Sequence, residues 1–418
     1  MQLAQAIEQL RVQLAQVSES GPGERQISVH FSPETDALNW LASQTRWPQF
    51  YWQSRSGEEI VAACGALERF HSVAEATLRL LVLPPGWRVF GANAIFGASD
   101  LFLPVLLWQQ DSAGHHLTIN LVSDGSLQQE ARRLLHWLAG LRPVQLAASL
   151  PHYHRVHHAP DKAGWVQRVN HALTAIAAGE LEKVVLARVS DFSLSGPLSA
   201  AALLAASQRI NPHSYHFMLA TEEHQALVGS SPERLYAREG SQLSSEALAG
   251  TADVHQPGLL MDKKNQWENS LVVEDIRQRL TDIVTELDVM PAELLPLRHL
   301  QHIRRPIRAR LMRPDDAQCV ERLQPTAAVA GMPRAAAQAF IRQQEPFSRG
   351  WYSGSVGYLS QSHSEFAVVL RCAQVSGAHV RLYAGAGIVS GSEPEREWEE
   401  IERKAATLGT LLTAENQG

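Results

Sequence analysis

The chain has 418 residues, of which 45% are hydrophobic and 19% charged, and its formal net charge at pH 7 is −6. A chain of this length and composition can bury a large core and is typical of a globular protein. The negative net charge provides no broad basic surface, so nucleic acid is not an expected partner. The sequence has no run of about 18 apolar residues and no basic segment before an apolar run at its start, which disfavours membrane insertion and secretion.

The three cysteines, Cys64, Cys319 and Cys372, lie far apart in the sequence. Their odd number excludes a fully paired set of intrachain disulfides, and free thiols suit a reducing compartment. None of them belongs to a Cys-x-x-Cys pair, so a structural zinc site built from thiolates is not expected. We therefore expect a cytoplasmic protein.

The first third of the chain predicts one short helix followed by strands. Apolar residues recur at helical spacing over residues 1–17, at Leu3, Ile7, Leu10 and Leu14. Between residues 27 and 125, short apolar runs alternate with turn residues, which is typical of strands in a mixed sheet. Residues 151–161 hold four histidines among turn formers and predict an exposed linker, because loop histidines are solvated far more often than they bind a metal.

Helices and strands alternate clearly after residue 162. The patterns predict helices over residues 166–178 and 198–210, and strands over residues 183–189, 226–229 and 366–375. Short turns join the later strands, so we expect antiparallel sheet covered by helices rather than a purely parallel sheet. The fold class that these patterns predict is α+β.

A buried carboxylate is predicted in the segment 262–287. Apolar side chains recur there at spacings of three and four residues and define the buried stripe of one long helix, at Val272, Ile276, Leu280, Ile283 and Leu287. Glu268 lies on the same stripe, where an unpaired charge would be costly, so its side chain needs a cation or a proton. Alternatively, Glu268 caps the stripe near the start of the helix and reaches water.

A second carboxylate lies in a helix predicted from Ser392 to about Leu412. Ser392 and Glu395 have the spacing of a capping box that opens this helix. Glu400 and Lys404 then fall on one face, which becomes apolar further along. Alone, such a pair is more typical of a surface ion pair that contributes well under about 1 kcal/mol.

Residues 383–389 predict a strand that ends in small residues. Gly385 and Gly387 would let an anionic ligand approach backbone N–H groups closely. The spacing does not match a dinucleotide-binding fingerprint, because Ser390 stands where the third glycine is required. In the predicted strand 366–373, Arg371 shares a face with apolar side chains, and a buried guanidinium needs a carboxylate from another side chain or from an acidic ligand.

Two further charged residues stand beside predicted strands. Lys183 opens a strand, and Glu233 follows a turn between two strands. By its local pattern alone, each residue is more typical of a solvated surface position.

These segments occur together in an order that resembles the chorismate-utilising enzyme family, across residues 160–412. Within that family the whole chain, including residues 1–159, is most similar to isochorismate synthases of the menaquinone pathway. An ordered set of segments is far more specific than any one motif. The segments are residues 183–188, 231–235, 246–251, 268–275, 323–331, 385–389 and 395–404.

The resemblance implies one large α+β domain in which two antiparallel β-sheets pack together and helices lie outside. Residues 1–159 would form its structural N-terminal part and residues 160–418 the chorismate-binding catalytic part. The implied activity is that of a cytoplasmic, Mg²⁺-dependent isomerase that converts chorismate into isochorismate. No glutaminase subunit is expected.

The resemblance also implies a role for each charged residue. Lys183 would activate water, and Glu233 would be the general acid. Glu268 and Glu400 would bind Mg²⁺. The substrate would be held by Gly250, Thr251, Arg371, Gly385, Gly387 and Lys404.

The implied reaction adds water at C2 of chorismate while the C4 hydroxyl leaves and the double bonds shift. Water is a poor nucleophile and hydroxide a poor leaving group, so the reaction needs a base and an acid whose pKa values lie nearer neutrality than about 10.4 for lysine and about 4.3 for glutamate. Burial moves both values in that direction. Mg²⁺ prefers oxygen ligands and would fix a carboxylate of the substrate.

Three alternatives remain open. The first is a salicylate synthase, which makes isochorismate and then expels pyruvate. The second step needs the enolpyruvyl side chain to be held in a bent pose, and the small apolar residues 327–331 offer no polar group to hold it. A synthase subunit for anthranilate or aminodeoxychorismate would use ammonia, whereas Lys183 favours water. A non-catalytic chorismate-binding regulatory subunit would need Arg371 and the glycines but neither proton-transfer group.

Overall fold

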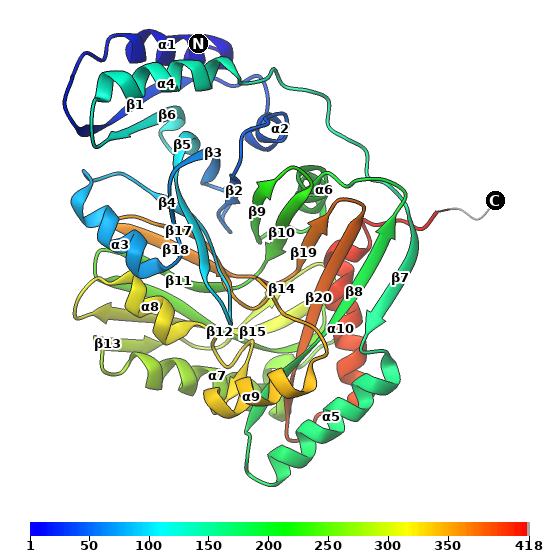
Figure 1. Cartoon of the computed structure of the whole chain (residues 1–418). Coiled ribbons are helices and arrows are strands. Elements are labelled where there is room, and N and C mark those ends of the chain that lie inside the picture. The colour runs from blue at the N-terminus through cyan, green and yellow to red at the C-terminus, as the bar shows by residue number, and fades with distance from the viewer. Residues whose placement is uncertain (416–418) are drawn as a thin grey trace.

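Two antiparallel sheets, joined through one long strand, form the centre of the computed structural model, which describes residues 1–415 (Figure 1). The joining strand β5 (Ser99–Asp111) pairs with β3 (Ile60–Phe70), β4 (Val89–Asn93) and β6 (Gly114–Ser123), and β6 pairs with β1 (Gly23–Phe31). The predicted α+β class is confirmed. The mixed sheet predicted for residues 27–125 is wrong, because these strands pair antiparallel.

The two branches that leave β5 are called here the first and the second sheet. The first sheet consists of β4, β17 (Ser355–Leu359), β18 (His363–Val368), β11 (Arg234–Glu239), β12 (Gln242–Asp253) and β15 (Leu300–Leu311), with β13 (Val284–Val289) and β14 (Glu293–Pro296) on β15. The second sheet consists of β3, β2 (Gln49–Gln53), β9 (Tyr215–Glu222), β10 (Gln225–Ser231), β19 (Cys372–Ser376), β20 (His379–Val389) and β8 (Lys183–Leu194), with β7 (Tyr153–Ala159) and β16 (Gly331–Met332) on β8.

Aromatic side chains pack the two sheets against each other. The ring centroids of Phe50 in the second sheet and Phe90 in the first lie 5.4 Å apart, and those of Trp52 and Tyr358 lie 6.1 Å apart. All four residues belong to one buried core that draws on both sheets. Burial of each such side chain stabilises the fold by roughly 1.5–3 kcal/mol, so the predicted packing of two sheets is confirmed.

Helices cover this pair of sheets (Figure 1). α7 (Lys263–Leu280) packs on β12 and β15, α10 (Pro394–Gly409) on β20, α6 (Ala200–Ile210) on β9 and β10, and α5 (Lys162–Ala177) on β8 and β20. The other helices are α1 (Leu3–Ala15), α2 (Ala37–Ala42), α3 (Val73–Val82), α4 (Leu127–Ala139), η1 (Leu259–Met261), α8 (Asp316–Leu323) and α9 (Arg334–Gln344).

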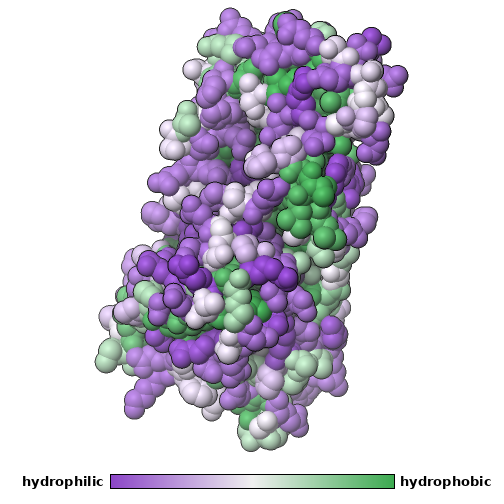
Figure 2. Space-filling model, turned by 90° about the vertical axis from the view of Figure 1, so that its left-hand side faces the viewer, coloured by the Kyte–Doolittle hydropathy of each residue, from purple (hydrophilic) through white to green (hydrophobic). Residues whose placement is uncertain are grey.

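Figure 2 shows a mostly hydrophilic face with one compact hydrophobic area. Within residues 1–415, no helix has the length and apolar character needed to cross a membrane.

Two predicted element boundaries are wrong. The helix predicted over residues 262–287 ends at Leu280, and Ile283 and Leu287 continue the apolar spacing only because the turn and β13 that follow also pack on the core. The predicted linker at residues 151–161 contains β7, whose polar side chains are tolerated because it pairs with the sheet on one side only. The coil between helix and strand lies earlier, at residues 141–152.

The predicted capping box of the C-terminal helix is also wrong. Glu393, not Ser392, is the N-cap of α10, and its side chain makes no capping hydrogen bond. The hydroxyl of Ser392 instead accepts a hydrogen bond from the backbone N–H of Val389, at 3.0 Å. Pro394 supplies the helical φ at the first position of the helix, so the helix begins there without a side-chain cap.

The chain crosses between the two sheets at two neighbouring points. It leaves the second sheet after β10, passes through Glu233 and enters the first sheet as β11, and it returns through Arg371 between β18 and β19. The backbone oxygen of Glu233 accepts from Val368 N at 3.0 Å, and that of Arg371 accepts from Ser230 N at 3.1 Å. The strand predicted over residues 366–373 is therefore broken, and Arg371 lies at the break with a positive φ of 48°.

A buried ion pair joins three elements of the first sheet and its cover. Arg238 of β11 contacts Asp316 of α8 through two hydrogen bonds, of 3.0 and 2.8 Å. The hydroxyls of Tyr236 and Ser364 donate to the same carboxylate, at 2.9 and 2.8 Å. Removal of one partner would leave a buried guanidinium without a counter-charge.

We expect Asp316→Ala to lower the free energy of unfolding by about 3–5 kcal/mol, because Arg238 would remain buried and uncompensated. Glu286→Ala is the matched control. Its carboxylate lies 4.0 Å from Arg310 and both side chains are more than half exposed, so a change within about 0.5 kcal/mol is expected. Denaturant unfolding followed by circular dichroism measures both. Equal effects of the two substitutions would contradict the structural role of the buried pair.

Candidate active site

One small cavity lies between the two crossings, α7, β20 and α10. Its lining includes seven of the residues that the sequence resemblance singles out, namely Glu233, Thr251, Glu268, Arg371, Gly385, Gly387 and Lys404. The other three lie just outside the lining. Lys183 contacts Glu268, Glu400 contacts Lys404, and Gly250 precedes Thr251 on β12. The structure thus brings all ten residues together.

Lys183 and Glu268 form a buried ion pair. The Lys183 side chain is fully buried at the start of β8, and its Nζ lies 3.0 Å from Oε1 of Glu268 on α7. This contact lacks hydrogen-bond geometry, so Nζ has no hydrogen-bond partner within residues 1–415. Burial favours the neutral form of Glu268, but Lys183 and Lys264 outweigh it and lower the pKa of this carboxyl. The solvated positions considered for both residues are therefore wrong.

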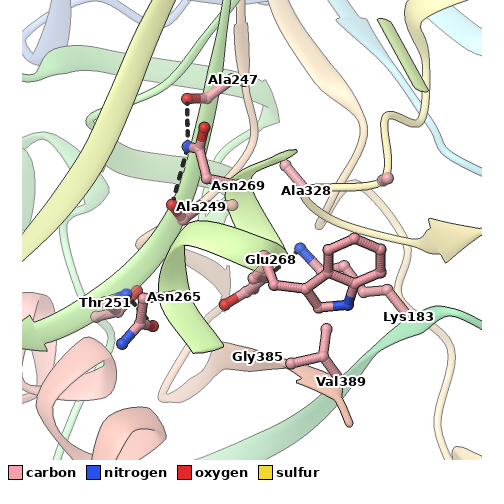
Figure 3. A network of polar contacts seen from close by, with 12 residues as sticks. Lys183, Ala247, Ala249, Thr251, Asn265, Glu268, Asn269, Ala328, Gly385 and Val389 are labelled. Carbon is pink, nitrogen blue, oxygen red and sulfur yellow. Dashed lines mark hydrogen bonds and ion pairs between the residues drawn. The ribbon is translucent and has the colours of Figure 1, made fainter. Parts of the chain in front are cut away.

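The backbone around this ion pair is held closely. Asn269, the residue after Glu268, donates to the backbone oxygens of Ala247 and Ala249, at 3.1 and 3.0 Å, and so fixes α7 on β12 (Figure 3). On the opposite side, a Cβ at Gly387 would overlap the Glu268 carboxylate and lie 2.7 Å from Cε of Lys183. Only glycine at this position of β20 leaves room for the pair.

Glu233 is a protonated acid at neutral pH. Its side chain is buried, and burial together with the nearby carboxylate of Glu246 raises its pKa to about 8, although Lys183, Arg371 and Lys404 favour the charged form. A carboxyl with this pKa can donate a proton at pH 7. The exposed turn position considered for Glu233 is wrong, because the residue lies at a crossing between packed sheets.

Three carboxylates and three lysines form a charged cluster at the start of α7, on α10 and at the start of β8. Glu268 contacts Lys183, Glu397 contacts Lys264 at 2.6 Å, and Glu400 contacts Lys404 at 2.7 Å. Burial and the neighbouring Glu400 raise the pKa of Glu397 to about 7. The pair Glu400–Lys404 is not an ordinary surface pair, because its two side chains are only 16% and 12% exposed. Lys404 also donates to the backbone oxygen of Gly385, at 2.7 Å.

Three side chains that line the cavity form a hydrogen-bonded chain. Arg371 contacts Nε2 of His302 at 3.1 Å, and Nδ1 of His302 contacts the hydroxyl of Thr251 at 2.9 Å. Burial, Arg371 and Lys404 lower the pKa of His302, so the ring is neutral. Because a guanidinium only donates, Nε2 accepts and Nδ1 carries the proton. Gly250 has a φ of 90° and lies against the backbone of Asn265, which a side chain would crowd.

Two residues of the site, Glu397 and His302, are missing from the sequence prediction. Glu397 stands three residues before Glu400 on the same helical face, and this spacing would have found it. Nothing in the local pattern of β15 marks His302, since its role depends on contact with the crossing at Arg371.

We expect one carboxyl group to titrate near pH 8, where its infrared carbonyl band is lost as the pH rises, because burial keeps Glu233 protonated below that pH. Glu233→Gln should remove this step and leave a lower step that belongs to Glu397. Infrared difference spectra between pH 6 and pH 10 measure it. A spectrum of Glu233→Gln that still shows the step near pH 8 would assign it to another group.

Most of the chain matches one known protein family. A family model described as chorismate binding enzyme matches residues 91–413. The chain belongs to the chorismate-binding enzyme family. Two relatives named isochorismate synthase MenF cover nearly the whole chain. The one from Escherichia coli K12 is 47% identical over 431 residues, with 99% of both chains covered. The one from Haemophilus influenzae is 38% identical over 428 residues, covering 99% of this chain and 97% of its own.

Solved structures agree with this assignment. The menaquinone-specific isochorismate synthase MenF from Escherichia coli superposes with a TM-score of 0.94 at 46% identity, over 98% of this chain and 100% of that chain. Anthranilate synthase component I from Streptococcus pneumoniae shares the fold, with a TM-score of 0.63 at 19% identity over 94% of this chain and 93% of its own.

Proposed function

We propose that this protein is an isochorismate synthase that interconverts chorismate and isochorismate. The observation that carries the proposal is one cavity lined by a protonated acid, Glu233, and by Glu268, whose carboxylate lies 3.0 Å from the buried Nζ of Lys183. Exchange of one hydroxyl for another needs a proton donor and a proton acceptor together. The two relatives named isochorismate synthase, at 47% and 38% identity over the whole chain, support the same reaction.

The cavity suits a substrate with two carboxylates. Arg371 and Lys404 bring two cations to its lining, and Gly385 and Gly387 keep β20 free of side chains where the ring would lie. Thr251 and Gly250 close the side formed by β12. Arg371 has no carboxylate hydrogen-bond partner within the described residues, so its guanidinium is available for an acidic ligand.

The proton transfers divide between two residues. Glu233 gives its proton to the C4 hydroxyl as that group leaves. Lys183 must first lose the proton of its ion pair with Glu268, and its neutral Nζ then takes a proton from the water that attacks C2. The absence of a hydrogen bond from Nζ to residues 1–415 leaves its remaining positions free for that water. Because each step is reversible, the reaction approaches an equilibrium mixture from either side.

The charged cluster is the proposed site of Mg²⁺. Glu268 and Glu400 would be its ligands, with Glu397 beside them. Carboxylate oxygens are the ligands that Mg²⁺ prefers, and these acids have only lysines as counter-charges in the cluster. When bound, the ion would fix a substrate carboxylate and draw electron density from the ring.

We also propose the compartment and the pathway in which the reaction takes place. All three cysteines are buried and unpaired, which suits the reducing cytoplasm. The similar Escherichia coli structure is described as menaquinone-specific, so we place this chain in menaquinone biosynthesis. Residues 1–159 act as the structural part and residues 160–418 as the chorismate-binding part.

We expect the purified protein with Mg²⁺ to convert chorismate into isochorismate, identified by chromatography and mass spectrometry. Lys183→Ala and Glu233→Gln should each lower kcat about 10²–10⁴-fold, because each removes one proton-transfer group. Substrate affinity should stay within about tenfold.

Lys263→Ala is the control for Lys183→Ala, since its side chain is exposed on the first turn of α7. It should keep normal activity. Stoichiometric pyruvate and salicylate in a coupled assay would show a salicylate synthase instead. An aminated product with ammonium would show an ammonia-using enzyme, and no turnover of chorismate would favour a binding subunit.

Glu268→Gln and Glu400→Gln should each raise the Mg²⁺ concentration needed for half-maximal activity by at least about tenfold, because each removes a charged oxygen ligand. Isothermal titration calorimetry of Mg²⁺ should show the same loss of affinity. Glu274→Gln, on the exposed face of α7, is the matched control and should bind Mg²⁺ normally. Full activity in excess chelator would rule out the metal.

A further inference from the structure

Two charged side chains hold the backbone on both sides of Glu233. Arg55 lies in the turn between β2 and β3, and its Nη1 donates to the backbone oxygen of Pro232 at 2.9 Å and to Oε1 of Glu246 at 2.5 Å. The same Oε1 accepts from the backbone N–H of Arg234 at 3.1 Å. Arg55 and Glu246 thus fix the residue before Glu233 and the residue after it.

The pair is buried at a considerable energetic cost. The side chains of Arg55 and Glu246 are 14% and 2% exposed. The second oxygen of Glu246 has no hydrogen-bond partner within residues 1–415, and the Nε of Arg304 lies 3.7 Å from it. A buried carboxylate with one unsatisfied oxygen destabilises the fold, so its presence here indicates a purpose other than stability.

That purpose follows from the position of Glu246 beside the acid. A negative charge at Glu246 opposes a second negative charge at Glu233 and contributes, after burial, to its raised pKa. The cations that face Glu233 act in the opposite direction. The charged and titratable groups around it are Lys183 of β8, Glu246 of β12, Glu268 of α7, His302 of β15, Tyr352 before β17, Arg371 at the second crossing and Lys404 of α10.

We propose that Arg55 and Glu246 are positioning residues that hold Glu233 at the first crossing for the reaction. The negative charge of Glu246 also favours the protonated form of Glu233. The inference rests on the proposed function, in which Glu233 is the general acid. It also gives residues 1–159 a part in the chemistry, because Arg55 comes from the segment expected to be structural.

Glu246→Gln tests the electrostatic half of the proposal, because it keeps the size and the hydrogen-bonding oxygen but removes the charge. We expect the alkaline limb of the kcat profile to move to lower pH by about one unit, with KM for chorismate within about twofold. The infrared step of Glu233 should move by the same amount. Glu293→Gln is the matched control, since Glu293 contacts the same Arg304 at 3.0 Å but is 53% exposed.

Arg55→Met and Arg55→Lys test the positioning half. Methionine contacts neither acceptor, and we expect kcat to fall roughly tenfold or more, since a small displacement of a catalytic group is costly. Lysine keeps the charge and has donors for both acceptors, but its side chain is shorter and reaches them less well, so an intermediate kcat is expected. Arg55 is less buried than Glu246, at 14% against 2% exposed, so its two variants test the proposal even if Glu246→Gln does not fold.

The two proposals fail in different ways. The infrared titration needs no substrate, so an unshifted step in a folded Glu246→Gln overturns the role of Glu246 whatever the reaction is. An unchanged kcat in Arg55→Met overturns the role of Arg55. A shifted infrared step in a protein that does not turn over chorismate would instead contradict the proposed function.

Discussion

The ion pair between Lys183 and Glu268 is the interaction on which the rest of the site depends. A fully buried ammonium group costs several kcal/mol unless a carboxylate lies against it. Here that carboxylate comes from α7, so the helix must begin close to the end of β8. Asn269 fixes the helix on β12, and Gly387 leaves the space that both side chains occupy. Each of these features follows from the need to keep one lysine dry and paired.

The second constraint is topological. The chain passes between the two packed sheets at two neighbouring points, and the cavity lies where the backbone changes partners. Glu233 and Arg371 occupy the two crossings and face the charged cluster of α7 and α10. The site is therefore dry enough to hold a glutamate in its protonated form, yet lined by cations that suit an acidic substrate.

The sequence predicts part of this arrangement and misses the rest for identifiable reasons. The helical stripe places Glu268 inward, and its burial is confirmed. The pattern around Arg371 predicts a continuous strand, because alternation of side chains does not reveal that a strand changes sheets. Lys183 and Glu233 look like surface residues by their neighbours alone, and only resemblance to a family singles them out. Glu246 and His302 act through contacts between distant segments, for which a single sequence holds no periodic signal.

The order of the chain has a consequence for how the protein is made. The cavity is lined by β8, the first crossing, α7, β20 and α10, and Arg55 from the N-terminal part supports the first crossing. Lys404 lies on α10, so a growing chain on the ribosome cannot form the site until this helix has been made and has left the ribosome. Contacts between such distant segments also make folding slow. Until the last helix docks, Glu268 and Arg371 lack their final surroundings, and chaperones would meet the two sheets with their shared interior still open.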